Sequence, residues 1–108
     1  MKETFGEYIR KLRTENELTL TQLAAKLDLD SANLCKIENG KREFDEKRLA
    51  KLAKVFHLDL EKLKAEFYSD FIAKKLYETN CNKEVFALAE QKIKYLKQKN
   101  VTQTKLNL

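Results

Sequence analysis

The chain of 108 residues is predicted to be all-α, and three observations lead to this prediction. It contains no proline and only two glycines, Gly6 and Gly40, so few residues would interrupt a helix. Leu, Lys, Glu and Ala dominate its composition, and all four favour helices. Apolar residues recur at spacings of three and four along most of the chain, which is the period of a helix with one buried face.

The first helix is expected to begin after Thr4 and to run to about Asn16. Thr4 and Glu7 form a capping box, in which each side chain accepts a hydrogen bond from the backbone amide of the other residue. One buried stripe follows, made by Phe5, Tyr8, Ile9 and Leu12.

The second and third helices are short and close together in the sequence. Thr19 and Gln22 form another capping box, so the second helix begins there. Its inward positions are Leu20, Leu23, Ala24 and Leu27. Asp30 is expected to cap the third helix, over about residues 31–39, and Gly40 ends it in the left-handed conformation.

Two further helices are expected before residue 80. Asp45 is predicted to cap the fourth and Asp59 the fifth, because a carboxylate accepts from the free amides of a first turn. The stripe of the fourth helix is formed by Leu49, Leu52, Ala53 and Phe56. The fifth buries Leu60, Leu63 and Phe67 and continues to about Thr79.

The segment Asn80-Cys81-Asn82 breaks the helical pattern, and a last helix is expected from about Lys83 to about Gln98. The polar end of the chain shows no period and is expected to be a flexible tail. The predicted organisation is a domain over residues 1–67, a helical extension over residues 68–99, and the tail over residues 100–108.

The second and third helices have the spacing of a helix-turn-helix, in which a small residue such as Ala24 lets the pair cross closely. From residue 18 to residue 42 the chain reads LTLTQLAAKLDLDSANLCKIENGKR, and residues 49–63 read LAKLAKVFHLDLEKL. Both stretches resemble the phage-repressor, Cro and xenobiotic-response-element class of helix-turn-helix regulators. The most specific pieces are residues 22–24 and 37–42. The resemblance implies a five-helix, lambda-repressor-like DNA-binding domain with additional C-terminal helices.

The resemblance also implies that one face of the third helix enters the major groove of duplex DNA. There Lys can donate to guanine, Asn can pair with adenine, Ser can make one bond and Ala can touch a thymine methyl group. The implied base contacts are Ser31, Ala32, Asn33 and Lys36. Outside this motif, the same set would be interpreted as a solvated helix face.

Two other groups of residues take roles from the resemblance. Phosphate contacts, which fix register without reading sequence, are implied at Thr19, Asn39, Lys41 and Arg42. Arg13 and Glu38 are implied to form a partly buried ion pair that joins the first helix to the third.

Four positions depart from the family pattern. Asp28 replaces the usual turn glycine, and Leu20 replaces a residue that contacts phosphate or base in many relatives. Asp30 adds negative charge close to the groove, and Phe44 lies near a common proline position. Leu20 is expected to lose one DNA contact and Asp30 to lower the affinity. Asp28 is expected to adopt the left-handed conformation at some strain, and Phe44 to alter the approach to the fourth helix but not the DNA face. The fold is expected to remain intact.

The C-terminal helices are expected to make a homodimer, because one helix-turn-helix reads only a short half-site and a pair reads a symmetric one. The side chains assigned to the interface are Phe71, Ile72, Leu76, Val85, Leu88, Ile93 and Leu96. The alternative is that these helices fold back as extra core of a monomer.

The function predicted from these features is a transcriptional regulator, a repressor or autoregulator, that binds double-stranded DNA. The alternative is a protein-interaction module, similar to an antitoxin or a co-regulator, whose partner is a toxin or a polymerase. The net charge of +5 fits a polyanionic partner weakly, because residues 1–67 hold 14 Lys and Arg against 13 Asp and Glu. Residues 68–108 hold 8 against 4.

An enzyme is the least favoured class, since the sequence shows no catalytic pair, phosphate loop or cofactor motif. Cys35, Cys81 and His57 match no zinc spacing, so no metal is expected, and the cysteines are interpreted as reduced thiols. A redox switch at Cys35 is a weaker hypothesis. With no apolar run long enough for a membrane and no signal peptide, the protein is expected to be cytoplasmic.

Overall fold

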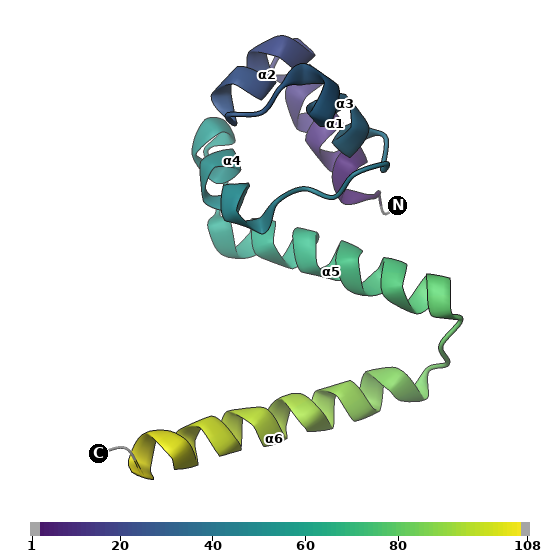
Figure 1. Ribbon diagram of the computed structural model, residues 1–108, viewed down its shortest axis with the longest axis vertical. Coiled ribbons are helices and arrows are strands. Elements are labelled where there is room, and N and C mark those ends of the chain that lie inside the picture. Colours follow the sequence, from purple (N-terminus) through teal and green to yellow (C-terminus); the bar gives the residue numbers. More distant parts are fainter. Residues whose placement is uncertain (1–2, 107–108) are drawn as a thin grey trace. The chain divides into compact units, whose positions relative to one another are not determined.

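The computed structural model describes the backbone of residues 3–106 and the side chains of residues 3–100. All regular structure in that part of the chain is helical (Figure 1), which confirms the predicted fold class. The elements in order are α1 (Phe5–Glu15), α2 (Leu20–Lys26), α3 (Ser31–Glu38), a 3-10 turn η1 (Glu46–Arg48), α4 (Leu49–Phe56), α5 (Leu60–Thr79) and α6 (Glu84–Leu106).

Capping boxes begin α1 and α2, as the sequence predicts. The Glu7 amide donates to Thr4 Oγ1 at 3.1 Å, and the Thr4 amide donates to Glu7 Oε1 at 2.9 Å. Thr19 and Gln22 make the same pair of bonds at 3.1 and 2.8 Å. Four backbone donors that a helix start leaves free are thereby satisfied.

The core is formed by side chains from α1 to the first turns of α5. Its fully buried members include Ile9 in α1, Leu23 in α2, Leu34 in α3, Leu52 in α4 and Leu63 in α5. Helix α3 packs against both α1 and α2. The outer side of α3 is left uncovered, so the core fixes the direction in which that helix faces.

Gly6 marks the place where α1 comes closest to α3. A Cβ atom added there would lie 2.2 Å from the carbonyl oxygen of Ile37 and 3.0 Å from that of Glu38. Only glycine allows this approach. The contact holds the start of α1 against the end of α3.

An aromatic cluster surrounds Phe5 at the start of α1. The Phe5 ring lies 5.7 Å from the Phe44 ring and 5.3 Å from the Phe67 ring, and Phe67 contacts Tyr68 edge-on. Phe44, which lies near the common proline position, is buried. It therefore ties the α3–α4 connection to α1 and α5.

Two expectations about helix boundaries are wrong, one about the start of α4 and one about the end of the last helix. Asp45 does not cap α4: it accepts from the Lys47 amide at 3.0 Å and caps η1, and α4 starts directly after that turn. The last helix does not end near Gln98 but continues to Leu106, so most of the predicted tail is helical. No glycine or proline follows Gln98, so no residue of the kind that usually ends a helix stops α6 before Leu106.

The chain divides into two compact units between Ala73 and Lys74, within α5. The first unit holds the whole buried core. The second consists of the end of α5, a turn and α6, and its described side chains are mostly exposed. Among the helices that the structure describes, none combines the length and the apolar character needed to cross a membrane.

Candidate nucleic-acid interface

The turn between α2 and α3 is held from several sides. Asp28 adopts the left-handed conformation, with φ of 57°, at the position where the family usually has glycine. The Arg48 side chain donates from Nε to the Leu27 carbonyl at 3.0 Å and from Nη2 to that of Asp28 at 3.2 Å. The Lys51 ammonium pairs with the Asp28 carboxylate and, with its hydrogen bond, lowers the pKa of that carboxyl. These bonds from α4 and the turn before it offset the strain at Asp28.

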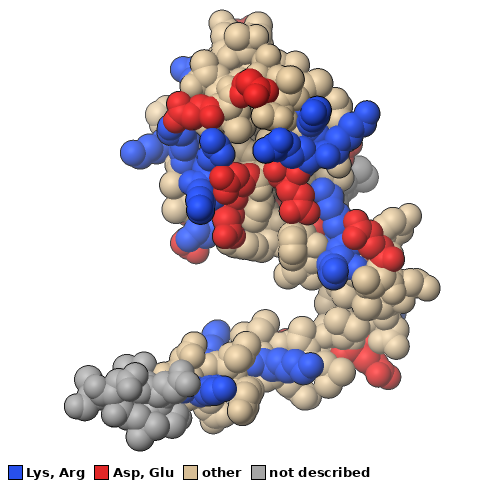
Figure 2. Space-filling model, viewed as in Figure 1, with Lys and Arg blue, Asp and Glu red and all other residues tan. Residues whose placement is uncertain are grey.

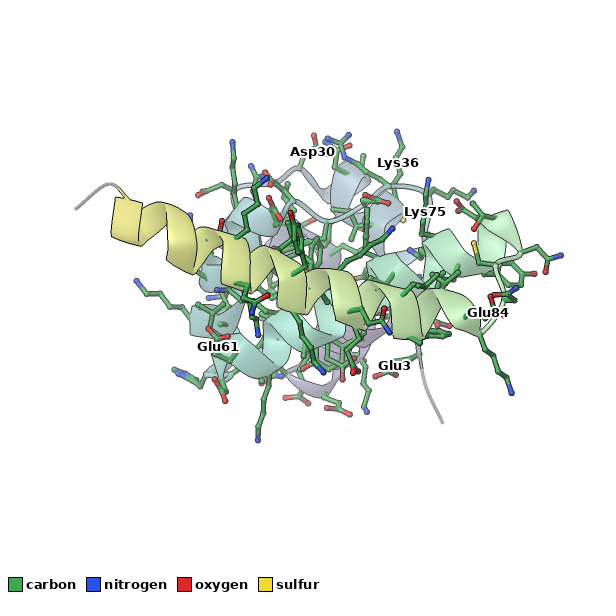
Figure 3. All side chains as sticks on the ribbon, turned by 90° about the horizontal axis from the view of Figure 1, so that it is seen from below. Glu3, Asp30, Lys36, Glu61, Lys75 and Glu84 are labelled. Carbon is green, nitrogen blue, oxygen red and sulfur yellow. The ribbon has the colours of Figure 1, made fainter. Side chains whose placement is uncertain are left out.

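Of the four side chains predicted to contact bases, three are exposed on the outer face of α3. Ser31, Ala32 and Lys36 are exposed, and Asn33 is half-buried. Lys36 projects outward on the same side as Asp30 at the start of the helix (Figure 3). A surface of small and polar groups with one ammonium can approach a base edge closely.

Asn33 is held by a network that sequence reasoning missed. Its Nδ2 donates to Asp30 Oδ2 at 2.9 Å, and its Oδ1 accepts from Arg42 Nη1 at 3.1 Å. Asp30 also caps α3 by accepting from the Asn33 amide at 2.7 Å. Both ends of the Asn33 side chain are therefore occupied. The partner at Arg42 lies nine residues away and leaves no local signal in the sequence.

The residues predicted to contact phosphate differ in whether their side chains already make hydrogen bonds within the protein. Thr19 lies at the start of α2 with its hydroxyl engaged in the capping box, and Lys41 is exposed after α3. Arg42 is the partner of Asn33. Asn39 accepts from the Arg10 guanidinium and donates to the Cys35 sulfur at 3.4 Å.

The ion pair expected between Arg13 and Glu38 is present. Arg13 Nε lies 2.7 Å from Glu38 Oε2, and Arg13 Nη2 lies 3.0 Å from Oε1. Glu38 is only 2% exposed. The hydrogen bond to this carboxylate raises the pKa of Arg13 above its ordinary value.

Two further bonds extend this pair. Arg13 Nη1 donates to the Leu18 carbonyl at 3.0 Å, and Arg10 Nε donates to Glu38 Oε1 at 3.3 Å. The periodicity of α1 places Arg10 away from the apolar stripe, and for that reason sequence reasoning gave it no role. The buried carboxylate of α3 is thus satisfied by two arginines of α1, which fixes the two helices relative to each other.

Charges of both signs are interspersed over the first unit, as Figure 2 shows for the face in view. No extended field of one sign appears on that face. Residues 1–67 hold 14 Lys and Arg against 13 Asp and Glu, so attraction of this unit to a polyanion depends on local groups such as Lys36, Lys41 and Arg42.

The side chains predicted to form a dimer interface are largely uncovered. Phe71, Ile72, Leu88, Ile93 and Leu96 are each more than half exposed, while Leu76 and Val85 are half-buried. Exposed aromatic side chains that the prediction did not include are Tyr68, Tyr77, Phe86 and Tyr95. Cys35 and Cys81 are free thiols. Among the described residues, no three His, Cys, Asp or Glu side chains gather as a metal site would require.

Comparison with known proteins finds similarity to helix-turn-helix regulators, both in a family model and in individual relatives. Residues 9–63 match the helix-turn-helix family. The HTH-type transcriptional repressor RghR of Bacillus subtilis (strain 168) is 39% identical over 83 residues, which cover 73% of this chain and 62% of that protein. The uncharacterized HTH-type transcriptional regulator RghRB of the same organism is 42% identical over 62 residues, covering 56% of this chain and 45% of that one. The chain thus spans less than two thirds of the length of these relatives.

A transcriptional regulator from Listeria innocua shares the fold. Its crystal structure superposes with a TM-score of 0.52 at 22% identity, covering 91% of this chain and 96% of that one. The likeness includes the C-terminal helices as well as the helix-turn-helix.

Proposed function

Because the chain belongs to the helix-turn-helix family, in its xenobiotic-response-element class, we propose that it binds double-stranded DNA and represses transcription. The observation that supports this most is the outer face of α3, which is exposed while its inner face is fixed to α1 and α2. A helix so held can enter a major groove without repacking the core. A protein of this function works in the cytoplasm.

Sequence is read, in this proposal, by four side chains of α3. Lys36 donates to guanine O6 or N7, Ser31 makes one bond, and Ala32 touches a thymine methyl group. Asn33 can pair with adenine only by exchanging its bonds to Asp30 and Arg42 for bonds to the base. Arg42 is released by the same exchange and becomes available to a phosphate.

The remaining contacts position the domain on the DNA backbone. Lys41 and Arg42 supply charge after α3, and Thr19 lies beside the free amides of the α2 start. Asn39 contributes through its amide nitrogen, whose present bond to the Cys35 sulfur is weak.

The proposed regulator acts as a homodimer. Two recognition helices roughly 34 Å apart would read a two-fold symmetric site on one side of the duplex. The exposed apolar residues of α5 and α6 supply the surface for pairing, since water-exposed groups of this size gain free energy when another surface covers them.

Selection of bound duplexes from a random DNA library tests this function. We expect a two-fold symmetric motif, and we expect Lys36→Ala to weaken binding to it by about 1–3 kcal/mol and to relax the preference at one position. Lys62→Ala removes the same charge from an exposed position of α5 and serves as the matched control. A library that yields no enriched motif would contradict the proposal.

That outcome would favour a second candidate, a protein-interaction module whose partner is a toxin or a polymerase. The observation behind this candidate is the interspersed charge of the first unit, with Asp28 and Asp30 exposed beside the predicted DNA face. Weak, salt-sensitive DNA binding without sequence preference, together with tight binding to a protein, would identify it.

A further inference from the structure

An aromatic groove lies in the first unit. It is lined by Glu43, Phe44, Asp45, Glu46, Phe67, Tyr68 and Phe71. Its aromatic members come from the α3–α4 connection and from α5. Phe71 is 51% exposed and Phe44 is buried, so the groove has an apolar floor and an open apolar side.

Three carboxylates from one segment, residues 43–46, line this groove, and two of them have no basic partner among the described side chains. Asp45 pairs with Arg48, with 3.1 Å between Oδ2 and Nη1. Glu46 accepts from the neutral Tyr68 hydroxyl at 2.9 Å, a bond that raises the pKa of Tyr68. Glu43 is exposed. An apolar groove bordered by uncompensated negative charge suits an apolar segment that carries cations.

Helix α6 has a face of that kind. Leu96 lies on its apolar stripe with Val85, Ile93 and Leu88, and all but the half-buried Val85 are more than half exposed. Lys92 and Lys99 are four residues before and three residues after Leu96, so they share this face. Lys94 lies on the opposite side, where it pairs with Glu90 at 3.7 Å. Lysine side chains are visible along α6 in Figure 2.

We propose that the aromatic groove of one copy binds the apolar face of α6 from a second copy, with Lys92 and Lys99 beside Glu43 and Glu46. This inference rests on the proposed homodimer and names the surfaces that make it. Two lysines within an apolar stripe oppose burial against a purely apolar partner, whereas carboxylates at the border of a groove compensate them. Each copy offers one groove and one α6, so the contact forms twice in a closed two-fold dimer.

Charge reversal in the groove and on α6 tests whether these two surfaces meet in the dimer. The groove variant is Glu43→Lys with Glu46→Lys, and the helix variant is Lys92→Glu with Lys99→Glu. The full chain is used, and sedimentation equilibrium at low salt gives the dissociation constant of the dimer. We expect each variant alone to raise that constant by about tenfold or more, because like charges then meet in both contacts.

An equimolar mixture of the two variants gives the decisive result. In the mixed dimer, one contact is the natural pairing and the other is the reversed one, so opposite charges meet in both. We therefore expect the mixture to dimerise about as tightly as the unaltered chain. Recovery of this kind also shows that both variants are folded. Lys83→Glu with Lys94→Glu makes the same charge change away from the apolar face, because neither residue is three or four positions from a member of the stripe, and it is expected to leave the dissociation constant unchanged.

Three results would overturn the inference. Variants that each dimerise as the unaltered chain does would mean that the dimer forms through other surfaces, and the proposed homodimer would stand. A mixture as weak as its components would mean that α6 and the groove do not meet between copies. A monomeric unaltered chain would remove the homodimer and this inference together, while the DNA selection tests α3 separately. Glu43→Lys alone repeats the test if the double change unfolds the protein.

Discussion

Glu38 is both the last residue of α3 and the residue that bonds α3 to α1. It ends α3, the helix assigned to the DNA groove, and its buried carboxylate receives Arg10 and Arg13 from α1. Both arginines lie outside the apolar stripe, so periodicity predicted neither; the family resemblance supplied Arg13, and nothing in the sequence pointed to the bond that Arg10 makes 28 positions away. A side-chain bond between residues far apart in the sequence, such as that of Arg10 with Glu38, cannot be predicted from local sequence pattern.

Gly6 is the second residue whose role appears only in the structure. In an exposed helix, glycine to alanine stabilises by about 0.5–1 kcal/mol. Here the added methyl would meet two backbone carbonyls of α3, which cannot move aside as a side chain can. We expect Gly6→Ala to lower the free energy of unfolding by about 1–3 kcal/mol.

Urea denaturation followed by far-UV circular dichroism measures this change. Gly40→Ala is the useful comparison, because Gly40 has free space around it and a φ of 75°, so its cost is backbone strain alone. A stabilised Gly6→Ala protein would show that α1 and α3 are farther apart than described.

At the scale of elements, helix starts are predicted well and helix ends less well. The boxes at Thr4 and Thr19 and the cap at Asp30 are local, so four residues of sequence suffice to identify them. Asp45 shows the limit of this reasoning, because the same side-chain bond can begin a 3-10 turn or an α-helix. The extent of α6 was missed because the residues after Gln98 show no apolar period and include weak helix formers, although no glycine or proline follows to end the helix.

The two capping boxes differ in charge, because the first contains the carboxyl of Glu7 and the second the neutral amide of Gln22. The Glu7 carboxylate accepts from the Thr4 amide, and this bond lowers its pKa, whereas Gln22 in the second box does not titrate. A carboxyl whose pKa is lowered by folding stabilises the protein above its ordinary pKa, and that contribution is lost as pH falls through the folded value.

We therefore expect Glu7→Gln to be less stable than the unaltered chain at neutral pH, and the difference to disappear in acid. Denaturation curves at several pH values on both sides of the ordinary glutamate pKa measure it. Gln22→Glu is the converse variant and is expected to acquire the same pH dependence. A difference that persists unchanged in acid would show that the Glu7 charge contributes nothing.

For the whole molecule, the family pattern was enough to predict the helix-turn-helix, the left-handed turn at Asp28 and the exposed face of α3. It could not predict the aromatic groove, because Phe44 and Phe71 are 27 positions apart in the sequence and neither belongs to a motif. A groove depends on how elements pack, and packing is not a local property of the chain.

Charge balance makes salt a sensitive probe of the proposed DNA complex. The first 67 residues are nearly neutral, so a few basic groups supply the phosphate contacts. We expect Lys41→Ala to weaken binding to all sequences alike and to reduce the slope of log affinity against log salt by about one. Fluorescence anisotropy at several salt concentrations gives the slope, and Lys54→Ala is the matched control. An unchanged slope would remove Lys41 from the interface.

Glu17 and His57 adopt the left-handed conformation, with φ of 56° and 55°, where an ordinary side chain costs on the order of 1 kcal/mol. Neither residue belongs to the core or to the outer face of α3. A glycine at either position relieves this strain and is expected to raise the free energy of unfolding. In evolutionary terms, such a glycine would restore folding free energy that a substitution elsewhere, for example on the outer face of α3, had removed. The surface of the first unit can therefore vary at a cost that these two positions are able to offset.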